Sequence, residues 1–128
     1  MLKDEVKEDF LRAKKALDSA ERNFEEGDIL TAANRAFVAC ENSVYILLKS
    51  KFGSTSISRM KILTKLAEID SMAKEAYDDS YDLRVQADYG RTAKTLPLNK
   101  ENLESTLKKV REIVKKAEKS INKDENDK

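Results

Sequence analysis

Apolar residues recur every three or four positions over most of the chain, the spacing that lines one side of an α-helix. This spacing predicts helices at residues 3–26, 29–52, 57–69 and 71–89, and a last helix between Asn99 and residue 121. The third and fourth of these are expected as two helices or as one bent helix. The sequence therefore predicts an all-α fold, an antiparallel up-and-down bundle of four to five helices.

The short breaks between the predicted helices carry residues typical of helix ends. Gly27 suits the left-handed position that follows a helix, and Asp28 can cap the helix that comes next. Asn99 is expected to cap the last helix. Connections this short favour helices packed beside their neighbours in the chain.

The segment 29–52 has two adjacent apolar stripes. The larger groups are Leu30, Ala33, Phe37, Cys40, Val44 and Leu48. The smaller stripe consists of Ala32, Ala36, Ala39, Ser43 and Ile46. Small side chains allow a second helix to approach closely while large ones fill the core. We therefore expect this helix to be central, with Cys40 buried as a small hydrophobe.

The chain of 128 residues is long enough for one core, and we expect a single domain at residues 1–121 followed by a disordered polar tail at 122–128. The net charge of +1 favours no particular partner and lacks the surplus typical of nucleic-acid binders. No stretch reaches the roughly 18 to 20 apolar residues of a membrane helix, and the N-terminus lacks the apolar core of a signal peptide. A cytoplasmic protein without membrane contact is expected.

Histidine is absent from the sequence, and this excludes many kinds of site. Neither an imidazole general base nor a Ser-His or Cys-His pair can form. The single cysteine rules out all-Cys zinc sites, and the acidic residues follow no EF-hand spacing. We therefore expect no catalytic residue, no metal and no cofactor.

Two groups of polar and aromatic residues are the candidates for a binding site. On the predicted helix 71–89, four residues share one face: Tyr77, Tyr81, Arg84 and Asp88. On the helix 29–52, a similar stripe contains Arg35, Asn42, Tyr45 and Lys49. A groove between two such helices would suit a nucleotide or RNA, because arginine pairs with phosphate and tyrosine stacks on bases.

A purely structural interpretation explains the same residues. Arg84 and Asp88 then form an ordinary i,i+4 ion pair, and Tyr89 with Gly90 marks the end of a helix. Tyr77 and Tyr81 become half-buried core residues whose hydroxyls reach water. Sequence alone leaves both interpretations open.

Two segments, "AANRAFVACENSVYILLKSKFG" and "LRVQADYG", resemble the HEPN superfamily, in particular its small stand-alone prokaryotic members. The matching positions are Ala32 to Phe37, Glu41, Leu47, Leu48, Arg84, Ala87, Asp88, Tyr89 and Gly90. The resemblance implies a helical bundle that commonly forms a homodimer and often works beside a minimal nucleotidyltransferase. Many of the proteins it resembles are metal-independent ribonucleases, toxins among them, with an arginine and a histidine separated by four to six intervening residues.

Three hypotheses follow. The leading one is a non-catalytic HEPN-like protein that dimerises and binds a nucleotidyltransferase or a nucleotide- or RNA-type ligand, with Arg84, Asp88 and Tyr89 in its binding site. The alternative is a divergent ribonuclease in which Tyr89 replaces the family histidine beside Arg84. A third is a nucleic-acid-binding adaptor. The missing histidine disfavours the second, and the near-neutral charge disfavours the third.

Overall fold

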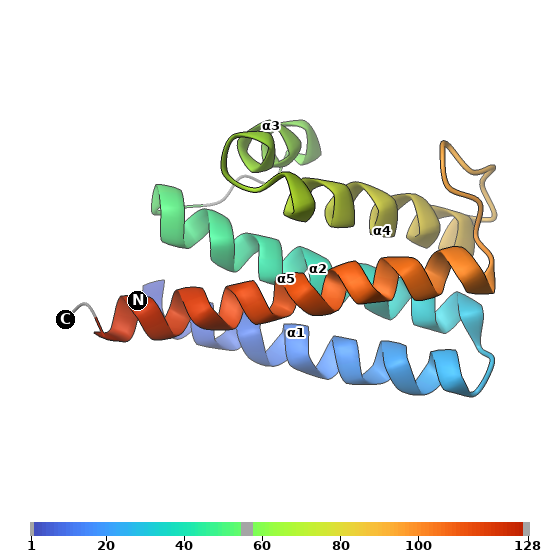
Figure 1. The fold of residues 1–128 in the computed structure, drawn as a ribbon, viewed down its shortest axis with the longest axis horizontal. Helices are drawn as coiled ribbons and strands as arrows, with labels where there is room; N and C mark the ends of the chain where they lie inside the picture. Colours follow the sequence, from blue (N-terminus) through green and yellow to red (C-terminus); the bar gives the residue numbers. More distant parts are fainter. Residues whose placement is uncertain (1, 55–57, 127–128) are drawn as a thin grey trace.

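The described part of the chain forms five helices. The computed structural model describes residues 2–54 and 58–126. Its helices are α1 (Leu2–Glu25), α2 (Ile29–Phe52), α3 (Arg59–Ile69), α4 (Ser71–Tyr89) and α5 (Lys100–Asn126). The four long helices alternate in direction along the bundle, and the short α3 lies across it (Figure 1). The predicted all-α up-and-down bundle is confirmed.

The helix ends follow the predicted caps. Gly27 adopts a left-handed φ of +88°, and the Asp28 carboxylate accepts a hydrogen bond from the Thr31 N–H at 3.1 Å. Asn99 caps α5 through the Asn102 N–H at 2.8 Å. A single extended residue, Asp70, separates α3 from α4, so these segments are two helices.

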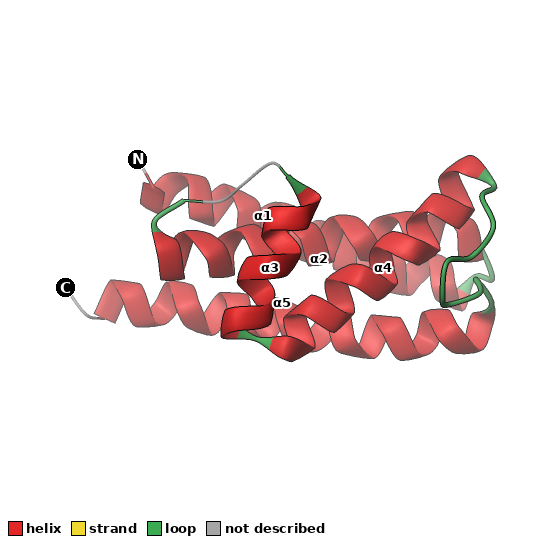
Figure 2. Cartoon of the chain, turned by 90° about the horizontal axis from the view of Figure 1, so that it is seen from above, coloured by secondary structure: helices red, strands yellow, loops and turns green. Residues whose placement is uncertain are grey.

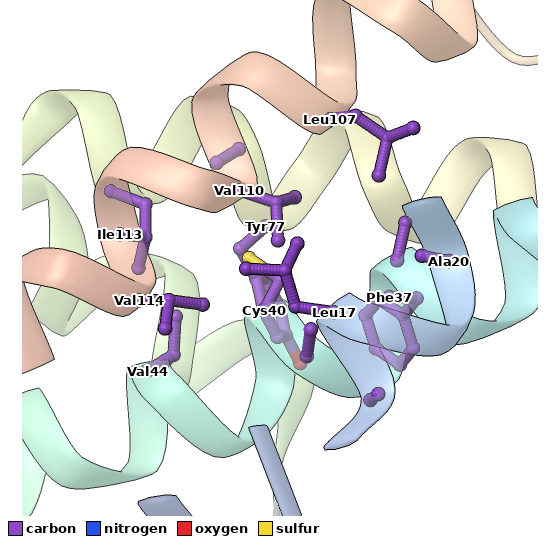
Figure 3. Packing of buried hydrophobic residues seen from close by; sticks show 14 of the residues in the cluster. Leu17, Ala20, Phe37, Cys40, Val44, Tyr77, Leu107, Val110, Ile113 and Val114 are labelled. Carbon is purple, nitrogen blue, oxygen red and sulfur yellow. The ribbon is translucent and has the colours of Figure 1, made fainter. Parts of the chain in front are cut away.

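The helix α2 is the centre of the bundle, as the two stripes predicted. It packs on α1, α4 and α5, and all five residues of its smaller stripe are buried. Figure 3 shows side chains of three other helices gathered around Phe37, Cys40 and Val44 of α2: Leu17, Tyr77, Val110 and Val114. Burial at 0% exposure confirms the expected role of Cys40 as a small core residue.

Two expectations from the sequence were wrong. Leu30 is 57% exposed, because it lies in the first turn of α2, where the stripe extends past the packed part of the bundle. Residues 122–126 continue α5 instead of forming a disordered tail, since no glycine or proline interrupts the helix before Asn126. Ile57, expected at the start of the third helix, and residues 127–128 lie outside the described residues.

The connection between α4 and α5 is held by one buried carboxylate. Asp82 of α4 is 5% exposed, and its oxygens accept backbone N–H bonds from Lys94, Thr95 and Leu96 at 2.9–3.0 Å. Gln86, one turn later, donates to the Leu96 carbonyl at 2.8 Å. Burial alone would raise the pKa of Asp82, but the backbone N–H donors outweigh it and hold this pKa below its usual value.

Replacing Asp82 by Asn should lower the free energy of unfolding at pH 7 by about 2 kcal/mol, because three backbone N–H groups of the α4–α5 connection lose an anionic acceptor. A carboxylate with a lowered folded-state pKa contributes stability above its unfolded pKa of about 3.9 and loses that contribution as the pH falls. The difference between wild type and variant should therefore shrink below about pH 4. Urea unfolding at several pH values measures it, with exposed Asp18→Asn as control. A constant difference down to pH 2 would contradict the argument.

Cys40 should resist thiol reagents in the folded protein. Burial raises the pKa of its thiol to about 12, so neither access nor thiolate is available. Labelling with a disulfide reagent at pH 8 is expected to be at least about 100-fold slower than in guanidinium chloride, where unfolding exposes the thiol. Equal rates in both conditions would show that the core around Cys40 opens easily.

Candidate functional site

A hydrogen-bond network between the neighbouring helices α2 and α4 joins three predicted site residues, Arg35, Arg84 and Asp88. Asp88 of α4 accepts from Arg84 Nε at 3.1 Å and from Asn34 Nδ2 of α2 at 2.8 Å. The Asn34 carbonyl oxygen in turn accepts from Arg35 at 2.7 and 2.9 Å. Two guanidinium groups, one amide and one carboxylate are thus linked across the surface between the helices.

Aromatic residues form the layer beneath this network. The rings of Tyr77 and Tyr81 each lie 5.6 Å from the ring of Phe37, measured between centroids. Arg59 of α3 covers Tyr81, with its guanidinium carbon 4.0 Å from the ring centroid. Tyr77 is only 3% exposed. These tyrosines therefore pack within the protein and offer no free ring for a base to stack on.

Glu41 and Tyr45 extend the polar surface along α2. Both are half-buried, and the Tyr45 hydroxyl bonds to the Glu41 carboxylate. Burial raises the pKa of Glu41, and the hydrogen bond from Tyr45 and the charge of Arg84 offset only part of that effect. Burial also raises the pKa of Tyr45, with the Glu41 charge adding to it, and that of Tyr77 to about 12. Neither Tyr45 nor Tyr77 is available as a phenolate base near neutral pH, because the raised pKa keeps its hydroxyl protonated.

Other predicted residues lie apart from the network. Asn42 donates to the Val38 carbonyl at 2.9 Å on its own helix. Lys49, from the same predicted stripe, binds Asp9 of α1 at 2.8 Å. Tyr89 is 61% exposed at the end of α4, with the Arg91 guanidinium 5.5 Å from its ring centroid. Five residues turn a helix by a net angle of about 140°, so Tyr89 and Arg84 lie on different sides of α4.

A comparison of the sequence with models of protein families identifies the family of this chain. The family model of the HEPN domain matches residues 6–121, nearly the whole chain. The chain belongs to the HEPN family. The resemblance carried by the two sequence segments is thereby confirmed. No curated protein matches the sequence of this HEPN domain.

Sequence reasoning did not place three residues in or beside the site of this HEPN domain: Asn34, Glu41 and Arg59. Asn34 lies next to Arg35 and, with Glu41 and Tyr45, occupies one face of α2 at spacings of seven and four, a signal present in the sequence. Arg59 comes from α3, and no periodicity predicts that it covers Tyr81. Its position depends on how α3 folds back over α4.

The described part of the HEPN domain was also searched for a metal-binding group and for a membrane-spanning helix. Among these residues, no three His, Cys, Asp or Glu side chains gather as a metal-binding group. No helix in the same part of the chain is long and apolar enough to cross a membrane.

Asn34 and Asp88 should be energetically coupled. Because they share one hydrogen bond between α2 and α4, a double-mutant cycle with Asn34→Ala and Asp88→Ala is expected to give about 0.5–1 kcal/mol of interaction energy. Urea unfolding of the four proteins measures it. The pair Arg22→Ala and Asp88→Ala is a control, since these residues lie on different helices without mutual contact and should be additive. If the free-energy changes of Asn34→Ala and Asp88→Ala simply add in the double variant, water replaces their hydrogen bond at no cost in stability.

Proposed function

We propose that this HEPN protein is non-catalytic and acts as a binding protein, forming a homodimer and associating with a nucleotidyltransferase-type partner. The surface formed by Asn34, Arg35, Glu41, Arg84 and Asp88 is the proposed contact region. The observation that carries the proposal is the ion pair of Arg84 with Asp88 in a chain without histidine.

The chemistry of RNA cleavage argues against an active site here. Metal-independent cleavage needs a group that takes the proton of the attacking 2′-hydroxyl and one that returns a proton to the leaving oxygen. A guanidinium such as that of Arg84 has no lone pair that readily accepts a proton, so it can stabilise charge but is not a general base. Tyr89 carries a phenol, which is a poorer general base at neutral pH than the imidazole of a histidine.

The composition of the surface suits a protein partner better than a long phosphate backbone. Its arginines are balanced by Asp88 and Glu41, so the charge surplus that drives nucleic-acid binding is missing. Alternating donors and acceptors beside half-buried Tyr45 and Val38 are typical of protein interfaces. A nucleotide-type ligand is the second candidate, favoured by the guanidinium of Arg84 at the edge of this surface, which can pair with a phosphate.

The tests use the purified protein, Arg84→Ala and the control Arg22→Ala, whose side chain is exposed on α1. Without metal, the wild type should cleave RNA no faster than Arg84→Ala. Light scattering at micromolar concentration should give a dimer. Co-expression with a minimal nucleotidyltransferase from the same organism should yield a complex that Arg84→Ala weakens by about tenfold and Arg22→Ala leaves unchanged.

Two results would overturn the proposal. Metal-independent RNA cleavage that disappears in Arg84→Ala would establish the ribonuclease alternative. A monomer that forms no complex with the co-expressed nucleotidyltransferase would remove the binding function.

A further inference from the structure

A groove of about 470 Å³ separates α3 from α4, outside the network described above. The two helices meet at Asp70 and diverge as the arms of a V (Figure 2). The short α3 packs mainly on α4, and only Ile62 and Leu66 of this helix are buried. One side of α3 is therefore left without a partner in the bundle.

The wall that α3 contributes to the groove is apolar. Met60, Leu63 and Ala67 recur at spacings of three and four, so they form one stripe along the helix. Met60 is 72% exposed, the largest exposed fraction among the large hydrophobic residues of the described chain. Such a stripe beside a second helix matches the grooves that accept an amphipathic helix.

The charges around the stripe are mostly positive. Arg59, Lys74 and Lys94 line the groove, and Asp78 is the one acidic residue among its lining side chains. Asp78 is already bonded to Arg59. Lys74 and Lys94 are exposed, and neither ammonium group makes an ion pair within the described part of the chain. The groove therefore combines an apolar stripe with two uncompensated cations.

We propose that this groove binds an acidic amphipathic helix of a partner protein, with apolar side chains on the Met60–Ala67 stripe and carboxylates at Lys74 and Lys94. The length of α3, 11 residues or about 16 Å, corresponds to three turns of a bound helix. The groove adjoins the candidate site at Arg59, which also covers Tyr81, but it lies outside the Asn34–Asp88 network, and the inference does not depend on the proposed function.

Other occupants match the groove less well. Nucleic acid would use aromatic rings for stacking, but Tyr77 and Tyr81 lie in or against the core and neither lines the groove. A second copy of the chain offers an acidic surface on α1, but that surface is lined by charged residues alone: Asp18, Glu21, Arg22 and Glu25. Glu21 there is already bound to Arg111 of α5 at 2.7 Å, which leaves fewer carboxylates for Lys74 and Lys94.

The experiment uses the full chain and a fluorescein-labelled peptide of about 14 residues, with leucines at i, i+3, i+4 and i+7 and glutamates elsewhere. Fluorescence anisotropy should show saturable binding. The double variant Lys74→Glu with Lys94→Glu should weaken it by about tenfold or more, because attraction becomes repulsion. Leu63→Ser should weaken binding as well, through loss of apolar contact.

The matched control is Lys14→Glu with Lys15→Glu, which makes the same charge change at exposed positions of α1 and should leave binding unchanged. Circular dichroism checks that each variant is folded. The proposal is wrong if a shuffled peptide of the same composition binds equally well, if both lysine pairs have the same effect, or if single-stranded RNA rather than the peptide is bound at Lys74 and Lys94. Because neither a dimer nor a nucleotidyltransferase is needed, failure here is distinguishable from failure of the proposed function.

Discussion

The close packing of α2 against three other helices is the constraint on which the rest of the structure depends. Ala32, Ala36 and Ala39 are each no more than 1% exposed, and their small side chains let neighbouring backbones come near. A larger residue at any of them would force helices apart, at a cost of about 1–3 kcal/mol. The same helix carries Phe37, which fills the space that opens between α2 and α4. The arrangement of large and small groups therefore determines where α4 lies.

This packing also determines the character of the polar surface. With α1, α4 and α5 in contact with α2, only a narrow part of that helix reaches solvent beside α4. Asn34 and Glu41 lie there half-buried, where unsatisfied polar groups would be costly. Hydrogen bonds from Asn34 to Asp88 and from Tyr45 to Glu41 satisfy them. The surface is thus stabilising for the fold as well as a candidate for binding.

The parts of the structure that follow from local spacing were predicted from the sequence. The helix α2 begins after Asp28 and ends before Gly53, which are residues typical of helix ends. Its buried face follows from apolar residues spaced every three or four positions within this one helix. Contacts between distant residues could not be predicted in this way. Asp82 reaches backbone N–H groups more than ten residues later, and Lys49 binds Asp9 across 40 positions. Nothing in a periodic pattern specifies such partners, because they depend on how finished helices pack.

The two surfaces differ in how their positive charge is compensated. Arg84 has a carboxylate 3.1 Å away and the ring of Phe37 at 5.2 Å, so its charge is balanced before any ligand arrives. An anionic ligand would have to replace Asp88, exchanging one anion for another with little net gain. A partner that offers both donors and acceptors can instead add to the network without breaking it. Lys74 and Lys94 have no such internal partner in the described chain, so an acidic group placed there would be attracted without displacing another carboxylate. Charge compensation therefore favours a neutral, hydrogen-bonding contact at Arg84 and an acidic one between α3 and α4.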